Sequence, residues 1–245
     1  MASIKDEALA VLEKCAVFKA VPAPSLVKLA GLARTEVFEN RTLLVANRAR
    51  PEHLRHVAAG RIDLSLTNAE GQTASLPVGA GRWATWLGCF HPEPIEHEIW
   101  AAPGTRALAF PAREVRQTVS EHPQALMTVI GLIGDTTRLL IGWALASTLF
   151  SPQQRLAFML LSMGGSRNAE GEAMRITQEQ IGQMGLGTRQ RVSRILHELA
   201  GLGLVSVDYG RVSIPSPDRL SDFVFGRAAA DGHRPPHPGF QVGRI

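Results

Sequence analysis

Residues 188–199 read Thr188-Arg189-Gln190-Arg191-Val192-Ser193-Arg194-Ile195-Leu196-His197-Glu198-Leu199. Folded as a helix, this stretch has two different faces. Apolar residues follow the i, i+3, i+4, i+7 spacing of a buried stripe: Val192, Ile195, Leu196 and Leu199. The opposite side carries side chains that donate hydrogen bonds: Arg189, Gln190, Ser193 and Arg194. No Asp or Glu lies between Glu179 and Glu198 to repel a phosphate backbone. The stretch therefore predicts a DNA recognition helix.

The surrounding residues predict a winged helix-turn-helix domain over residues 150–225. A first helix is expected from Gln153 to Met163, between Ser151-Pro152 and Gly164-Gly165. The polar residues 166–175 predict a loop or a short hairpin. Thr177-Gln178-Glu179-Gln180 has the pattern of a capping box, so a second helix is expected there. Thr188 would cap the recognition helix, and residues 202–214 would form the hairpin of the wing.

The string from Ile176 to Leu196 closely resembles the helix-turn-helix of the Crp/Fnr transcription regulators. The expected DNA contacts are Arg189, Gln190, Ser193, Arg194, Thr188, Gln178 and Arg191. Arg189 and Arg194 can each bind the O6/N7 edge of a guanine with two hydrogen bonds. Gln190 stands where family members usually have Glu, so adenine or a less strict preference is expected there. A helix-turn-helix used only for a protein contact is the alternative.

The backbone of the DNA is expected to meet a different group of side chains. Thr188 and Gln178 would contact phosphates, helped by the N-termini of their helices. Arg191 lies to the side of the helix and would contact the backbone, whereas Ser193 would touch a base or a phosphate.

The first 120 residues predict a domain rich in strands, after short helices at residues 4–14 and 24–34. Alternation between apolar and polar residues, as in Arg61–Thr67, marks strands with one wet face. Gly- and Pro-containing turns separate seven short apolar runs, which predicts an antiparallel barrel or sandwich. The runs are Glu36–Phe38, Leu43–Val45, His56–Ala58, Ile62–Leu66, Ser75–Val78, Ile99–Ala101 and Ala107–Phe110.

Residues 57–65, 79–90 and 100–102 together resemble the cyclic-nucleotide-binding β-roll of the Crp/Fnr regulators, a double-stranded jelly-roll. Family members that bind nucleotides carry a Glu for the ribose and an Arg for the cyclic phosphate. The resemblance places Trp86 at the first position and Glu96, or a neighbour, at the second. A carboxylate there would repel a phosphate by roughly several kcal/mol in a half-buried site. We therefore expect no binding of cAMP through the family's usual contacts.

Aromatic residues gather around the same loop and suggest a pocket for another small molecule. The expected effector pocket contains Trp83, Trp86, Cys89, Phe90, Glu96 and Trp100. The alternative is that these rings fill the space of a nucleotide and leave a structural domain without a ligand. Cys89 and His91 could also act as axial haem ligands. Because Cys89 falls where the family usually has an aliphatic core residue, no cofactor and no metal site is predicted.

Residues 121–149 predict a long helix that joins the sensor domain of residues 1–120 to the DNA-binding domain. An apolar seam with steps of four and three indicates pairing with a second helix. The seam comprises Leu126, Ile130, Ile133, Thr137, Leu140 and Ala144. Val129, Leu132, Leu139 and Trp143 give a second apolar side. The resemblance implies a parallel homodimer, and a helix buried within one chain is the alternative. The polar residues 226–245 predict a disordered tail.

The composition limits the remaining possibilities. The net charge is only +4, so the local arginines, and not the global charge, indicate a nucleic acid. The start of the chain lacks the apolar segment of a signal peptide, and the longest apolar stretch, Leu139–Phe150, is too short to span a bilayer. The sequence predicts a cytoplasmic α+β protein that is not an enzyme and does not use a membrane.

The predicted function is therefore a homodimeric transcription regulator that reads double-stranded DNA. Its other expected partners are a small-molecule effector, not identified by the sequence, and RNA polymerase if it is an activator. A regulator that binds DNA constitutively through a ligandless β-roll is the alternative. An enzyme or a nucleotide-binding regulatory subunit is disfavoured, because the sequence shows no nucleophile–base set, P-loop or metal-ligand spacing.

Overall fold

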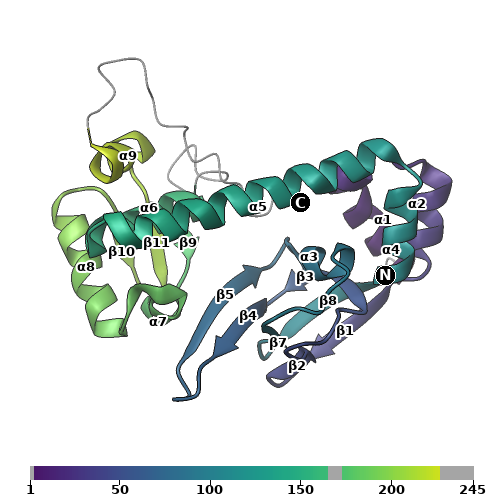
Figure 1. The fold of residues 1–245 in the computed structure, drawn as a ribbon, viewed down its shortest axis with the longest axis horizontal. Helices are drawn as coiled ribbons and strands as arrows, with labels where there is room; N and C mark the ends of the chain where they lie inside the picture. The colour runs from purple at the N-terminus through teal and green to yellow at the C-terminus, as the bar shows by residue number, and fades with distance from the viewer. Residues whose placement is uncertain (1–2, 165–172, 227–245) are drawn as a thin grey trace. The chain divides into compact units, whose positions relative to one another are not determined.

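The computed structural model describes residues 3–164 and 173–226 of the chain (Figure 1). They form two compact units, with the boundary between Ile133 and Gly134. The predicted tail at 226–245 lies outside the described residues except for Gly226, and so does most of the loop predicted at 166–175.

Two four-stranded antiparallel sheets form the centre of the first unit (Figure 1). One sheet has the order β1-β8-β3-β6 and the other has the order β2-β7-β4-β5. Seven of these strands lie where the short apolar runs between turns predicted them, and the two-residue β6 was not predicted. The bounds are β1 Arg34–Phe38, β2 Thr42–Val45, β3 His53–Ala59, β4 Arg61–Thr67, β5 Thr73–Gly79, β6 Trp83–Ala84, β7 Glu98–Ala101 and β8 Thr105–Pro111. The prediction of an antiparallel β-roll is confirmed.

The register of the strands decides which side chains face the inside of the roll. Val57 and Ala84 of the first sheet share a small apolar core with Ile62 and Ile99 of the second. Directly paired residues of antiparallel strands point to the same side. Arg55 pairs with Ala84 and Ala109, so its side chain also starts from the inner face. Glu36 pairs with Ala107, which in turn pairs with Val57, and therefore lies on that face too.

Helices pack on the outer face of the first sheet. Leu54, Leu108 and Phe110 share the main core of this unit with residues of α1 (Ile4–Lys14) and α2 (Ala23–Ala30). A 3-10 turn, Ala16–Ala20, lies between these helices. The second helix is shorter than the predicted range 24–34, because Gly31 ends it and β1 begins at Arg34. Two helices of this unit were not predicted, α3 (Trp86–Phe90) and α4 (Ala112–Ser120).

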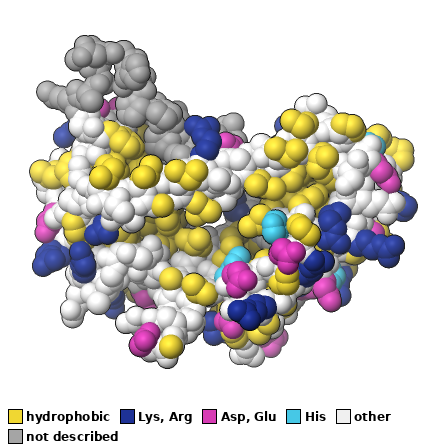
Figure 2. Space-filling model, in the orientation of Figure 1, with side chains coloured by type: hydrophobic (Ala, Val, Ile, Leu, Met, Phe, Trp, Pro, Cys, Tyr) yellow, Lys and Arg dark blue, Asp and Glu magenta, His cyan; other side chains and the backbone are white. Residues whose placement is uncertain are grey.

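The helix α5 (Pro123–Leu149) has 27 residues and agrees with the predicted range 121–149. Ala125 and Val129 of its first half are buried in the core of the first unit. Several large apolar side chains remain exposed along it, and Figure 2 shows hydrophobic side chains on the visible face of this helix. They are Leu126, Met127, Ile130, Leu140, Ile141, Leu145 and Leu149. By length and composition alone, this helix is long and apolar enough to cross a membrane.

The second unit combines helices with a small three-stranded sheet of order β10-β11-β9. Its core contains Leu156 and Leu160 of α6, Val192 and Leu196 of α8, and Leu220 of α9. The bounds are α6 Pro152–Gly164, β9 Met174–Arg175, α7 Gln178–Ile181, α8 Arg189–Gly201, β10 Ser206–Asp208, β11 Arg211–Ser213 and α9 Pro217–Phe225. The helix-turn-helix and the two-stranded wing were predicted, whereas α9 was not. Strand β9 lies at the end of the range 166–175, where a loop or a short hairpin was expected.

Candidate nucleic-acid interface

The turn between α7 and α8 is built by caps and glycines. Thr177 and Gln180 form the predicted capping box: the Gln180 amide donates to the Thr177 hydroxyl at 3.1 Å, and the Thr177 amide donates to the Gln180 side chain at 2.8 Å. A wider helical turn, Gly182–Leu186, follows α7. A Cβ atom on Gly182 would lie 2.3 Å from the Gly187 carbonyl oxygen, so no larger residue fits there. The turn that joins the two helices is therefore packed backbone against backbone.

Helix α8 presents the two faces that the sequence predicted. The Arg191 amide donates to the Thr188 hydroxyl at 3.3 Å, so Thr188 caps the helix. The apolar stripe is buried, with at most 1% of Val192, Ile195, Leu196 and Leu199 exposed. Arg189, Gln190, Arg191 and Arg194 are exposed, and Ser193 is partly exposed. The arginine and amide groups are therefore open to solvent, although Nε of Arg194 lies 4.0 Å from the carboxylate of Glu198, while the opposite face holds the helix in place.

Six of the seven predicted DNA contacts line one shallow surface of the second unit. This surface is formed by Gln178, Thr188, Arg189, Gln190, Ser193, Arg194 and His197. Arg191 does not line it, and its side chain lies near Gly187. His197 was not predicted, although it lies one turn beyond Ser193 on the same helix face and its Nδ1 is 2.8 Å from the Ser193 carbonyl oxygen. An i, i+4 count from Ser193 would have found it.

A second surface lies between the wing and the start of α7. Gln178 and Arg189 line it together with Tyr209 and Arg211 of the wing. Tyr209 is fully exposed at the turn of the hairpin, and Arg211 is also exposed. The sequence predicted the wing but not these two residues as contacts. Glu179 and Asp208 line the same surface, so it is less basic than the face of α8.

The residues of the expected effector pocket are distributed over different parts of the first unit. Trp83, Trp86 and Cys89 are buried in its main core. Trp83 packs against Phe110 with ring centroids 5.4 Å apart and against Trp86 at 5.8 Å. Phe90 is half-buried and stacks on Trp86 at 5.8 Å with an interplanar angle of 20°. These rings therefore contact one another as core residues.

Trp100 and Glu96 do not join this aromatic cluster. Trp100 alternates with Ile99, which faces the inside of the roll, so Trp100 lies on the outer face of the second sheet. There its indole nitrogen donates to Glu98 at 2.8 Å, and the Arg41 guanidinium lies 3.7 Å from the ring centroid. Glu96 is exposed in the segment before β7. The structure thus separates two of the six residues from the other four.

The inside of the roll contains a buried ion pair that the sequence reasoning missed. Nε of Arg55 donates to Glu36 at 2.8 Å, and only 5% of Arg55 is exposed. Arg34 donates to the same carboxylate at 2.8 Å. Burial raises the pKa of Glu36, but the hydrogen bonds and charges of Arg55 and Arg34 outweigh this effect and hold the pKa below its usual range. Sequence alternation could have placed Arg55 inward but could not have identified its partner.

Neither cysteine has the surroundings of a reactive thiol. Burial raises the pKa of Cys89 to about 11 and that of Cys15 to about 12.

Within residues 3–164 and 173–226, no three His, Cys, Asp or Glu side chains come together as a metal site. His91 is exposed, whereas Cys89 is fully buried.

The predicted dimer seam is largely open to solvent. Leu126, Ile130, Thr137, Leu140 and Ala144 are exposed. Ile133 is only partly exposed and packs against the core of the first unit. Of the predicted second apolar side, Val129 and Leu139 are buried. One side of the helix therefore packs against other residues of its own chain, and much of the seam stays exposed.

Comparisons with known proteins agree with this architecture. Residues 154–223 match the model of the Crp-like helix-turn-helix domain. No curated protein matches the chain. Solved structures with the same fold include FixK2 from Bradyrhizobium japonicum, with a TM-score of 0.66, 16% identity and coverage of 78% of this chain and 96% of that one.

Two further structures are similar over most of their length. A CooA mutant from Carboxydothermus hydrogenoformans has a TM-score of 0.61 and 19% identity, covering 79% of this chain and 88% of that one. The c-di-GMP responsive regulator CLP from Xanthomonas campestris has a TM-score of 0.57 and 15% identity, covering 80% of this chain and 100% of that one. The chain therefore carries a Crp-like helix-turn-helix domain within the fold of the Crp/Fnr transcription regulators.

Proposed function

We propose that the protein is a cytoplasmic, homodimeric transcription regulator that reads double-stranded DNA with α8. The carrying observation is the surface of α8, where Arg189, Gln190 and Arg194 are exposed while the opposite apolar face is buried. Side chains of this kind at the first turns of a recognition helix reach base edges in the major groove. Contact with RNA polymerase belongs to the proposal only if the regulator is an activator.

Each polar side chain of this surface has a proposed role. Arg189 and Arg194 bind guanine edges, and Gln190 favours adenine, because its amide matches the N6/N7 edge. Ser193 contacts a base or a phosphate. Gln178 and Thr188, at the N-termini of α7 and α8, contact phosphates, and Arg191 contacts the backbone from the side. His197 and Arg211, which lie beside these residues, extend the contact.

The exposed seam of α5 supports a homodimer. Leu126, Ile130 and Leu140 are each at least 37% exposed in the single chain, although they are spaced as a helix-pairing seam. A second copy of α5 would cover them. Two recognition helices related by a twofold axis would then read half-sites about 34 Å apart on the DNA.

The inner face of the roll supports an effector other than cAMP. Arg55, a buried cation of this face, is already paired with Glu36, and the family resemblance puts Trp86 at the position of the ribose-binding carboxylate. The alternative, constitutive DNA binding without a ligand, is supported by the packing of Trp83 and Trp86 into the core. Tryptophan fluorescence during titration with nucleotides, aromatic compounds and acyl compounds separates the two versions. A saturable change favours an effector, and no change with any compound favours constitutive binding.

Selection of bound sequences from random DNA tests the main proposal. We expect the selected sites to be near-palindromes, and Arg194→Ala should abolish their specific binding while the protein stays dimeric. Lys28→Ala, which removes an exposed cation from α2 of the first unit, is the control and should bind normally. An Arg194→Ala protein with an unchanged footprint would contradict the proposed role of α8.

Sedimentation equilibrium tests the dimer separately. Ile130→Glu with Leu140→Glu places two charges in the seam and should give monomers. Gln124→Glu, at an exposed position outside the seam, should leave the dimer unchanged. Dimers that persist in the double variant, or a purified chain that requires detergent, would refute this use of α5.

A further inference from the structure

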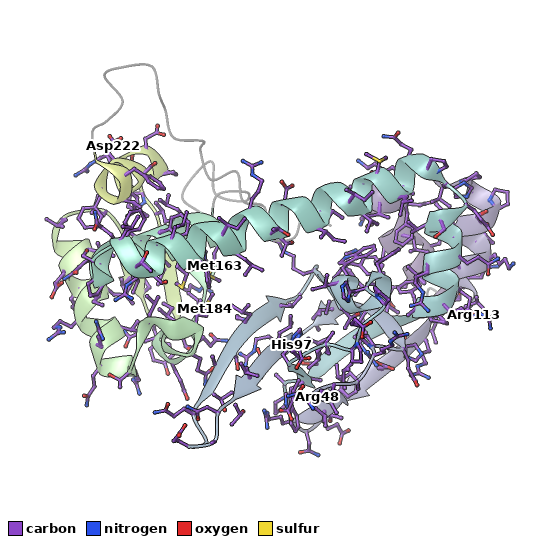
Figure 3. All side chains as sticks on the ribbon, viewed as in Figure 1. Arg48, His97, Arg113, Met163, Met184 and Asp222 are labelled. Atoms are coloured by element: carbon purple, nitrogen blue, oxygen red, sulfur yellow. The ribbon has the colours of Figure 1, made fainter. Side chains whose placement is uncertain are left out.

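A pocket on the outside of the first unit gathers three arginines from two segments that are distant in sequence. It has a volume of about 510 Å³ and is lined by Arg50, Glu52, Phe90, His91, Arg113 and Arg116, among others. Small-molecule sites have volumes of roughly 300–1,000 Å³. Arg50 lies just before β3, whereas Arg113 and Arg116 lie on α4, where Figure 3 labels Arg113. We name this site the arginine pocket.

The charge of the arginine pocket is unbalanced. Arg50, Arg113 and Arg116 are all exposed, and none of them forms an ion pair within the described residues. Arg116 uses one amino group, Nη1, to donate to the Cys89 carbonyl oxygen at 2.7 Å. Glu52 is the one carboxylate among the lining residues. Three guanidinium groups therefore face one carboxylate, and most of their donors are free.

An aromatic wall and a further donor complete the site. Phe90 is half-buried, stacks on Trp86 and lines the pocket. His91 accepts a hydrogen bond at Nδ1 from the Glu93 amide at 3.2 Å, so in this tautomer its Nε2 carries a proton and can donate. A ligand with an anionic group and a flat apolar part would match both the arginines and Phe90.

The floor of the pocket is rigid. A Cβ atom on Gly88 would lie 2.5 Å from the ring of Pro51, so α3 and the segment before β3 are in close contact. The Ala112 amide donates to the Glu52 carbonyl oxygen at 2.8 Å and fixes the start of α4 to the same segment. The pocket is therefore held in shape by the packing of Gly88 on Pro51 and by a main-chain hydrogen bond, and not only by its exposed side chains.

We propose that the arginine pocket binds a small phosphorylated molecule that carries an aromatic or other flat apolar group. A phosphoryl group has close to two negative charges at neutral pH and three acceptor oxygens, which suits several guanidinium forks. A single carboxylate would gain less from the arginines while meeting the same repulsion from Glu52. The binding of this ligand does not depend on the proposed DNA-binding function. Only its role as the effector of the regulator rests on that function.

Calorimetric titration of the full chain with phenyl phosphate, at low salt and in a buffer without phosphate, tests the proposal. We expect saturable binding of one molecule per chain. Arg113→Gln and Arg50→Gln should each weaken it about tenfold, because each removes a charge-assisted hydrogen bond. Both positions are exposed, so both variants should melt like the unchanged protein.

The control variant is Arg189→Gln, because the arginines of α8 are the other plausible site for a phosphate. This variant should bind phenyl phosphate normally. Inorganic phosphate, which lacks the ring, and benzoate, which lacks the phosphoryl group, should both bind more weakly. No saturable binding, a loss in Arg189→Gln alone, or equal binding by benzoate would each overturn the proposal. The titration uses no DNA, so its failure is distinct from a failure of the regulator proposal.

Discussion

Glu36→Gln removes the negative charge from the buried ion pair inside the roll and keeps the shape of the side chain. Glu36 accepts from Arg55 at 2.8 Å and from Arg34 at 2.8 Å, and only 13% of its side chain is exposed. Nη1 of Arg55 is buried without a hydrogen-bond partner, so Glu36 supplies the main compensation for this charge. After the substitution, a nearly dry guanidinium would remain without a counter-ion.

The expected loss of stability is large because Arg55 cannot move into water without opening the sheet. At an effective dielectric constant of about 20, two unit charges 2.8 Å apart attract each other by about 6 kcal/mol. Part of this attraction is offset by the desolvation of the carboxylate, which the neutral amide avoids. Removing one partner of a buried pair destabilises proteins by about 3–5 kcal/mol. Since the amide oxygen can still accept from Arg55, we expect about 3 kcal/mol for Glu36→Gln.

Urea unfolding followed by tryptophan fluorescence measures this change, because Trp83 and Trp86 lie in the core of the same unit. With a slope of about 2 kcal/mol per molar urea, the midpoint should fall by about 1.5 M. The control is Glu39→Gln, which neutralises an exposed carboxylate three residues after Glu36 and should shift the urea midpoint little. A change below about 1 kcal/mol for Glu36→Gln would show that water or another group compensates Arg55.

Three further outcomes are expected from the same unit. Because the folded pKa of Glu36 is depressed, its contribution to stability is present above the unfolded pKa of about 4.3 and is lost as the pH falls through the folded pKa. Urea midpoints measured from pH 7 to pH 3 should show this loss of stability. The Glu36→Gln protein should not show it. Burial raises the pKa of Cys89 to about 11, so alkylation of the native protein at pH 8 should be far slower than in urea, by mass spectrometry. Gly88→Ala should lower the free energy of unfolding by about 1–3 kcal/mol, because its methyl group would overlap the ring of Pro51; a calorimetric melting temperature equal to that of the unchanged protein would refute this.

The strands and the DNA-binding helices could be predicted because their signals are local. Arg61–Thr67 alternates residue by residue, and Thr177 and Gln180 satisfy each other within one helical turn. The recognition helix combines a capping residue with an apolar stripe, and both follow from spacing alone. Where a structure depends on contacts within a few residues, the order of the residues is enough to find it.

The residues expected to form an effector pocket were harder to place, because their positions depend on which face each strand turns inward. Trp83 and Trp100 are both aromatic and close to the same loops, yet they lie on outer faces of different sheets. The register that separates them is set by pairing across the sheets, and a single sequence does not contain it. The arginine pocket was missed for the same reason, since Arg50 and Arg113 meet only through folding. Helix α4 has a mainly polar sequence, but Ala112, Val115 and Val119 follow the i, i+3, i+7 spacing of a buried stripe, so this helix could have been predicted.

The backbone contact between Gly182 and Gly187 has a consequence for how binding preference can change over evolutionary time. This close approach involves main-chain atoms of the turn between α7 and α8, so it does not depend on the exposed side chains of α8. Substitutions at Gln190 or Arg194 can therefore change the polar face of α8 without disturbing the turn that precedes it. If α8 reads DNA as proposed, a lineage that keeps the two glycines can change its operator one residue at a time.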